Sequence, residues 1–176
     1  MSSVLGILVA IMAIAASAQL SISLPENVSV APITGQSLAI LVAAHILKWK
    51  NATVTVVLYL LIGAFGIPVF SDFSSGTEVL FGNSAGYLLG FVVSSAVVGI
   101  MADKNSKRFT NYLLQMTVGT ILILLCGGLG LLRFLDVHEV FSLGIKPFLF
   151  GAIAKIFLGA ILLSVYWNIK KKLTEF

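Results

Sequence analysis

Six apolar runs alternate with short polar segments along the chain, and this pattern predicts an all-α integral membrane protein with six transmembrane helices. The runs cover residues 4–20, 34–47, 52–63, 86–101, 112–132 and 148–167. A helix perpendicular to the membrane needs about 17 to 25 residues, so the second and third runs are short. They fit two short spans or a re-entrant hairpin, and we favour two spans because the charged turn Lys48-Trp49-Lys50 between them needs water.

The first run allows two interpretations. Ala16-Ser17-Ala18 resembles the cleavage site of a signal peptide, but a signal peptide begins with positive charges, and no charged residue precedes Glu26. We therefore interpret residues 4–20 as a membrane helix. Small residues recur along it at spacings of four, three and four, on one face where another helix can approach closely. From the residues alone, this face packs against the chain's own helices. Its members are Gly6, Ala10, Ala13 and Ser17.

The longest polar interruption follows the third run. Residues 63–91 contain a proline, several glycines and a polar stretch between two apolar helices. Irregular backbone near membrane depth is tolerated only where protein or water satisfies its polar groups. The sequence therefore predicts that this segment borders a site for a small ligand.

Composition narrows the class of protein. Apolar residues make up 59% of the chain and charged residues 10%, and the mean hydropathy is +1.07. A soluble domain carries about 25% charged residues, so this class is excluded. The length of 176 residues and the lack of a linker predict one transmembrane domain over residues 1–176.

The charges predict the topology and explain the net charge of +4 without nucleic acid. Eight cations lie in two of the loops and at the end of the chain: Lys48, Lys50, Lys104, Lys107, Arg108, Lys170, Lys171 and Lys172. The positive-inside rule then places both termini in the cytoplasm of a multi-pass protein of the cell membrane. Five of the seven carboxylates fall on the outer side: Glu26, Asp72, Glu78, Asp136 and Glu139.

Lys155 lies within the last apolar run, ~12 Å from its outer end at 1.5 Å per residue. A lysine at the centre of a span costs about 2.5–3.5 kcal/mol on insertion scales. No carboxylate is one turn away, since Ala152 and Gly159 occupy those positions. The side chain either extends along the helix to the interface or faces a cavity with an anionic ligand. We favour the cavity because of its depth.

Other polar residues in the outer half of the predicted spans could complete such a cavity. They are Thr34, Gln36, Asn83, Ser84, Gly86 and Tyr87. Amide and hydroxyl groups suit a ligand with a urea or amide head, and a lysine suits a carboxylate. The alternatives are helix capping for Thr34 and Ser84 and an interfacial aromatic for Tyr87.

Residue types for catalysis or metal binding are sparse. The single Cys126 lies in an apolar run and reads as a packing residue, while His45 and His138 fall at opposite ends of the topology. No HExxH, GxSxG or GxxxxGK[ST] motif is present. We therefore expect no metal, cofactor or ATP site. An intramembrane enzyme remains the competing class, and Lys155 argues against a purely structural subunit.

Four segments together resemble the BioY biotin transporter family. They are residues 31–39 (APITGQSLA), 59–70 (YLLIGAFGIPVF), 86–91 (GYLLGF) and 147–155 (PFLFGAIAK), and their order and spacing agree over nearly the whole chain. The resemblance implies the fold of a substrate-binding (S) component of an energy-coupling factor (ECF) transporter, with biotin as ligand.

It also implies partners, which are a transmembrane coupling subunit, two cytoplasmic ATPases and the lipid of the surrounding membrane. In S components a small-residue face of the first helix contacts the coupling subunit, which would assign Gly6, Ala10, Ala13 and Ser17 to that interface. Lys155 would pair with the biotin carboxylate, while the 71–87 segment closes over the ring from outside.

The chain departs from the family pattern at two places. Residues 82–87 read GNSAGY where the family often has GPTGGY, and Ala152 stands where an aspartate often precedes the lysine by three residues. That aspartate would hold the ureido group or pair with the lysine. Asn83 is the candidate to replace it as the ureido partner. Another small carboxylate vitamin is the alternative ligand.

Overall fold

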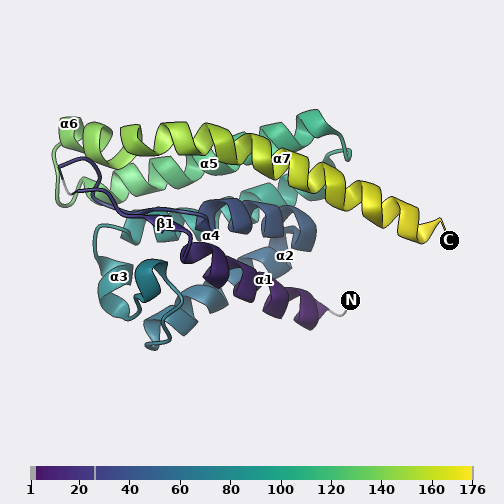
Figure 1. Ribbon diagram of the computed structural model, residues 1–176, viewed down its shortest axis with the longest axis horizontal. Coiled ribbons are helices and arrows are strands. Elements are labelled where there is room, and N and C mark those ends of the chain that lie inside the picture. The colour runs from purple at the N-terminus through teal and green to yellow at the C-terminus, as the bar shows by residue number, and fades with distance from the viewer. Residues whose placement is uncertain (1–2, 26, 176) are drawn as a thin grey trace.

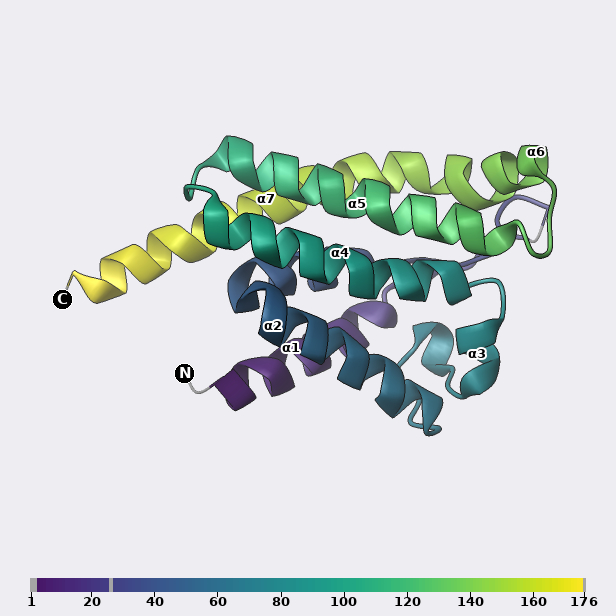
Figure 2. The same cartoon turned by 180° about the vertical axis from the view of Figure 1, so that it is seen from behind.

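The computed structural model describes residues 3–25 and 27–175, and it is a bundle of apolar helices with one small hairpin. Figures 1 and 2 show α4 (Ala85–Lys104), α5 (Phe109–Leu131) and α7 (Lys146–Thr174) side by side along the long axis. The helices α1 (Ser3–Ala18) and α2 (Gln36–Ala64) pack together on one side of them. The start of α1 and the end of α7 lie at the same end of the molecule (Figure 1).

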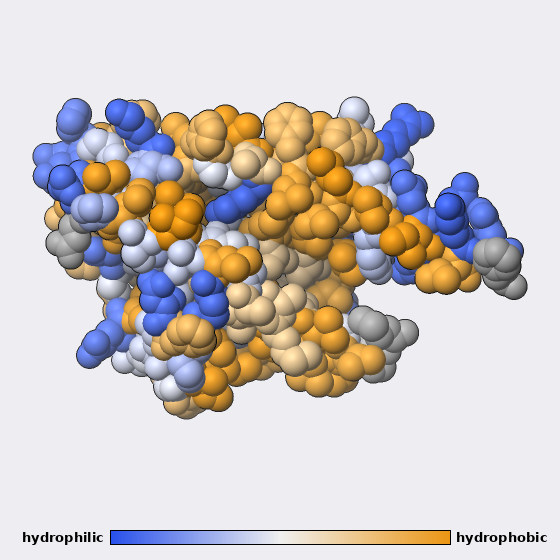
Figure 3. All heavy atoms as spheres, in the orientation of Figure 1, coloured by the Kyte–Doolittle hydropathy of each residue, from blue (hydrophilic) through white to orange (hydrophobic). Residues whose placement is uncertain are grey.

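The surface is consistent with a membrane protein. Figure 3 shows a broad apolar belt between two hydrophilic ends, of which one is formed by the last turns of α7. Among the described residues, four helical stretches are long and apolar enough to cross a membrane: Gln36–Ala64, Ala85–Lys104, Phe109–Leu131 and Val137–Thr174. Helices satisfy their own backbone groups, which is the requirement that lipid imposes on any spanning segment.

The helix α2 is broken at Lys48, which has φ 64° and ψ 169°. It therefore consists of two arms, residues 36–47 and 49–64, that meet at the predicted charged turn. The turn packs directly on α4, since a Cβ at Gly99 would lie 2.4 Å from Trp49 Cα. Lys48 forms an ion pair with Asp103 at 2.6 Å (Nζ to Oδ1). The structure thus has two short helical arms around an exposed charged turn, as predicted, while their crossing of the membrane as two spans stays a prediction.

The first arm differs from the prediction at its start. A hairpin of β1 (Ser21–Ile22) and β2 (Ile33–Thr34) pairs Ser21 with Thr34, so α2 begins at Gln36 rather than at residue 34. The first helix likewise ends at Ala18, before residue 20. Glu26, one of the carboxylates predicted on the outer side, lies outside the described residues.

The predicted loop over residues 133–147 is wrong for most of its length. It contains α6 (Val137–Glu139) and the π-helix η2 (Val140–Ile145), which leads directly into α7. Asp136 caps α6 by accepting from the Glu139 backbone N–H, and the Glu139 side chain accepts in return from the Asp136 backbone N–H. This capping box has a recognisable sequence pattern that the hydropathy profile does not register. The last predicted helix ends at residue 167, but α7 continues through Lys170, Lys171 and Lys172 to Thr174.

Close glycine contacts join α4 to α5. A Cβ at Gly130 would lie 2.6 Å from Gly86 Cα, and a Cβ at Gly90 would lie 2.9 Å from Ile123 Cα. Only small residues permit helices to approach this closely in lipid. The polar segment after α2 folds as the short helices η1 (Ser71–Phe73) and α3 (Thr77–Phe81) beside the start of α4.

Candidate functional site

A cavity lies where β2, α2, α4, α5 and α7 meet beneath η1. It encloses about 760 Å³ of space between its lining atoms, with its open mouth included. Figure 3 shows a hydrophilic spot in a hollow between α7 and the helices below it, inside the apolar belt. Its apolar walls are Ala31, Pro32, Phe70, Val79, Leu88, Phe91, Ile123, Leu124, Phe148 and Ala152. Its polar lining is Thr34, Gln36, Ser37, Ser71, Ser84, Tyr87, Thr120 and Lys155.

Lys155 points into this cavity from α7. Its Nζ donates to the backbone carbonyl of Thr34 at 2.6 Å and lies 3.2 Å from Ser37 Oγ. An ammonium has three N–H donors, so one remains for a ligand. No carboxylate pairs with Lys155 within residues 3–25 and 27–175. The lysine is thus a partly buried cation that protein dipoles hold in place and that no charge among the described residues neutralises.

Gln36 and Thr34 form a fixed polar edge at the start of α2. Thr34 Oγ1 donates to Gln36 Oε1 at 3.0 Å, and Gln36 Nε2 donates to the Tyr59 hydroxyl. That hydroxyl donates in turn to the Val69 carbonyl at 2.8 Å. The Thr34 hydroxyl therefore bonds to a side chain and does not cap α2, which has no side-chain cap at its start.

Tyr87 is buried, with 7% of its surface exposed, and is not an interfacial aromatic. Its hydroxyl donates to the Gly144 carbonyl of η2, and its ring lies 5.4 Å from the Phe148 ring. The tyrosine thus joins the start of α4 to the start of α7 while it lines the cavity. Ser84 lines the cavity beside it and makes no side-chain cap for α4.

Two predicted site residues are not brought into the cavity. Asn83 is exposed and does not line it. Gly86 faces α5 instead, since a Cβ there would lie 2.4 Å from the carbonyl oxygen of Cys126. The sequence placed both residues in the site because they open the predicted fourth helix, but Asn83 lies in the turn before α4 and Gly86 is on the face that packs against α5.

Sequence reasoning missed Ser37, Ser71, Thr120 and Tyr59. Ser37 directly follows the predicted residue Gln36, but it is 118 residues away in the chain from Lys155, and only the packing of α2 against α7 brings the two together. Tyr59 lies in a segment already quoted for its family resemblance, yet its position in an apolar run gives no indication of a hydrogen-bonding role. Only the packing of both arms of α2 brings its hydroxyl to Gln36.

Side-chain hydrogen bonds of Gln19, Ser21 and Ser23, together called the latch, hold residues 70–73 above the cavity. Gln19 Nε2 donates to the Phe70 carbonyl at 3.0 Å, and the Phe73 backbone N–H donates to Gln19 Oε1 at 3.0 Å. Asp72 accepts from the hydroxyls of Ser21 and Ser23, the latter at 2.9 Å. These two bonds, of which the one from Ser21 is the stronger, hold the pKa of the Asp72 carboxyl below its usual value. The latch ties η1 to the β1 hairpin.

The small-residue face of α1 packs mainly inside the chain. Gly6 and Ala10 are buried, and a Cβ at Gly35 would lie 2.7 Å from the Ser17 carbonyl oxygen. Ala13 is exposed. Part of this face is therefore occupied by α2, which is the packing that the residues alone favoured.

The chain is similar to known proteins over most of its length. The family model described as "BioY family" matches residues 1–172. A biotin transporter BioY from Thermotoga maritima is 33% identical over 132 residues, covering 74% of this chain and 78% of that protein. Biotin transporter BioY2 from Lactococcus lactis subsp. cremoris is 34% identical over 141 residues, covering 79% of this chain and 75% of that protein.

One solved structure has the same fold. It is described as the S-component for biotin from an ECF-type ABC transporter, and its TM-score is 0.83 at 19% identity. The match covers 94% of this chain and 90% of that chain. The predicted S-component fold is thereby confirmed.

Proposed function

This chain belongs to the BioY family, and we propose that it captures biotin outside the cell as the S component of an ECF transporter. It is a multi-pass protein of the cell membrane, and its named relatives are transporters rather than enzymes. One observation carries the proposal: an unneutralised lysine faces a cavity with mainly apolar walls and a few fixed polar groups. Such a cavity suits a small, mostly apolar anion.

The proposed pose follows from the lining. The biotin carboxylate pairs with Lys155, which offers its remaining N–H donor. The ring system lies between Phe91, Phe148 and Tyr87, and its ureido group meets hydroxyl and amide groups of the lining. Ala152 lines the cavity three residues before Lys155, so no aspartate competes there with the ligand's carboxylate. A ureido contact from exposed Asn83 requires residues 82–84 to move inward.

The topology is part of the proposal. We infer six crossings, in which the two arms of α2 and helices α1, α4, α5 and α7 each span the membrane, with both termini in the cytoplasm. The break at Lys48 supports separate arms because it exposes two lysines and a tryptophan at one end of the molecule. At 1.5 Å per residue the arms measure roughly 18 and 24 Å, which a tilted or locally thinned bilayer accommodates.

The coupling partners are inferred from the family. A transmembrane coupling subunit and two cytoplasmic ATPases would supply the energy for transport. Gly6, Ala10, Ala13 and Ser17 remain the proposed contact with the coupling subunit. Because Gly6 and Ala10 are buried against α2, such a contact starts at exposed Ala13 or requires α1 to move.

Calorimetry of biotin binding to the purified protein tests the proposal. We expect nanomolar affinity, about −12 kcal/mol, and a loss of at least about tenfold in Lys155→Ala, since a charge-assisted bond contributes about 1.5–3 kcal/mol. Lys146→Ala, an exposed lysine at the start of the same helix, is the matched control and should bind normally. Tight binding that Lys155→Ala leaves unchanged would remove the lysine from the site.

Two further results separate the alternatives. No binding of biotin, together with binding of another small carboxylate vitamin that Lys155→Ala weakens, would replace the ligand while keeping the S component. Unchanged biotin affinity in Asn83→Ala would exclude Asn83 as the ureido partner.

A further inference from the structure

A second recess lies at the opposite end of α7 from the biotin cavity. It encloses about 960 Å³, open mouth included, between the start of α5 and the end of α7. Its lining is polar and aromatic rather than apolar, and consists of Lys107, Tyr112, Ser164, Trp167, Asn168, Lys170, Lys171 and Thr174. The proposed biotin site makes no use of these residues.

Two lysines of the recess share one indole ring. The Nζ of Lys107 lies 3.5 Å from the centre of the Trp167 ring, and the Nζ of Lys170 lies 4.8 Å from it. A cation over an aromatic face is attracted to it, but two cations held on one ring repel each other. An anion bound near both ammonium groups would relieve this repulsion.

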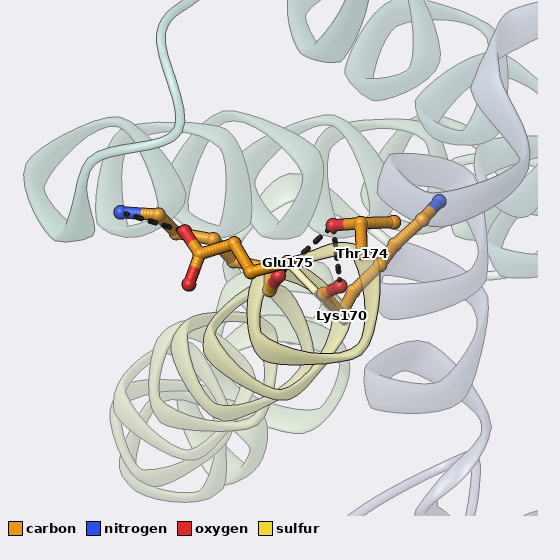
Figure 4. A network of polar contacts seen from close by, with 4 residues as sticks. Lys170, Thr174 and Glu175 are labelled. Atoms are coloured by element: carbon orange, nitrogen blue, oxygen red, sulfur yellow. Dashed lines mark hydrogen bonds and ion pairs between the residues drawn. The ribbon is translucent and has the colours of Figure 1, made fainter.

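The carboxylates at this end pair with lysines other than Lys107 and Lys170, although one of these, Lys171, also lines the recess. Asp103 pairs with Lys48 at 2.6 Å and Glu175 with Lys171 at 3.7 Å, and the described part of the chain has no ion pair for Lys107 or Lys170. Figure 4 shows the Lys170 ammonium directed away from the Glu175 carboxylate, on the other side of the α7 end. Thr174, between them, donates its hydroxyl to the backbone carbonyls of α7.

The indole ring of Trp167, near which both lysines lie, is held in place by a hydrogen bond to His45. Trp167 Nε1 donates to His45 Nε2 at 3.0 Å, so this histidine nitrogen is an acceptor and the imidazole is neutral. The other nitrogen, Nδ1, then donates to Gln115 Oε1, and Tyr112 packs edge-on against the imidazole at 5.1 Å. His45 and Gln115 are buried. The recess therefore has a rigid wall that joins α2, α5 and α7.

The surroundings match a lipid rather than a free ion. Exposed apolar residues follow the recess along α7 at four-residue spacing, where an acyl chain can lie against one stripe of the helix. They are Ile161, Val165 and Ile169, which are 50%, 49% and 54% exposed. Trp167 is of the aromatic type that lies at headgroup depth, while buried Tyr112 forms the inner wall of the recess.

We propose that this recess binds the phosphate of an anionic membrane lipid such as phosphatidylglycerol, with Lys107 and Lys170 as its charge partners. Under the inferred topology the lipid belongs to the cytoplasmic leaflet, where basic pockets between helices bind anionic headgroups. The inference does not depend on biotin as the cargo.

Native mass spectrometry of the detergent-purified full chain with mixed phosphatidylglycerol and phosphatidylcholine tests this. We expect selective retention of phosphatidylglycerol, and about a tenfold loss of it in Lys107→Gln/Lys170→Gln. The matched control is Lys104→Gln/Lys172→Gln, which removes the same charge at the same end without touching the recess lining. It should retain the lipid as the parent does. Equal loss in both double variants would overturn the proposal, because it would indicate a general charge effect.

Fluorescence in a Trp49→Phe background distinguishes the source of the phosphate, since Trp167 is then the single tryptophan. Phosphatidylglycerol should shift its emission at concentrations where glycerol phosphate and inorganic phosphate do not. An equal response to the soluble phosphates would overturn the lipid assignment. The same response in Lys107→Gln/Lys170→Gln would overturn the lysines as its partners.

Discussion

The cavity and the recess both place lysines of α7 beside aromatic side chains, yet the two regions hold their charges in different ways. Lys155 is partly buried and bonded to a backbone carbonyl and a hydroxyl. Lys107 and Lys170 are exposed, and their ammonium groups lie 3.5 and 4.8 Å from the centre of the Trp167 ring. Water screens exposed charges but reaches a partly buried one less. Loss of charge should therefore have a large effect on the ligand in the cavity and a modest one in the recess.

Charge reversal in the cavity should have the largest effect. Lys155→Glu places a carboxylate where the proposed biotin carboxylate binds, so we expect a loss of at least about a hundredfold in affinity by calorimetry. Lys146→Glu is the control variant, because Lys146 is exposed and does not line the cavity. An equal loss in both variants would show that reversal acts through the overall field rather than through a direct contact.

A smaller effect should come from the polar edge of the cavity. Tyr59→Phe removes the hydroxyl that positions Gln36 and holds the Val69 carbonyl. An unsatisfied buried group costs about 1–3 kcal/mol, so we expect lower thermal stability and roughly tenfold weaker biotin binding. Tyr166→Phe on α7 serves as the matched control. The double variant Tyr59→Phe/Gln36→Leu removes both polar partners of this hydrogen bond. If Gln36 contacts the ligand, this second change should not restore binding.

The latch should control exchange more than affinity. Asp72→Asn weakens the bonds from Ser21 and Ser23 and should raise the rate of biotin release about threefold in a stopped-flow chase. Glu78→Gln, an exposed carboxylate of α3, should leave the rate unchanged. Faster release in both variants would implicate the charge of the outer surface instead of the latch.

The same latch gives a pH dependence. Because the folded-state pKa of Asp72 is lowered, its stabilising effect is present above the ordinary carboxyl pKa of about 4 and is lost as the pH falls through the lowered value. The protection of the amides of residues 70–74, measured relative to the intrinsic exchange rate at each pH, should therefore stay constant near neutral pH and fall only under acid conditions. A fall in this protection already near neutral pH would contradict the assignment.

The smallest effect concerns the recess. Lys107→Gln/Lys170→Gln should change biotin affinity by less than about twofold, since independent distant sites contribute additively. A larger change would show that the two ends of α7 are coupled. It would then connect the recess to biotin binding through the helix that they share.

The sequence alone determined the class, the family and the position of the critical charge. Apolar runs give helices in lipid whatever their partners, because no water is available for backbone groups. The depth of Lys155 within its run needs no tertiary information. The mainly helical membrane class, the charged turn at residues 48–50 and the family resemblance are confirmed.

The tertiary structure decided which neighbours of these residues face the cavity. Asn83 and Gly86 are adjacent to lining residues but point elsewhere, while Ser37 and Tyr59 reach the site through packing between distant segments. The recess likewise combines the start of α5 with the end of α7. Hydropathy reports how a residue partitions into lipid, whereas the direction of a side chain and its partners depend on how the helices pack against one another.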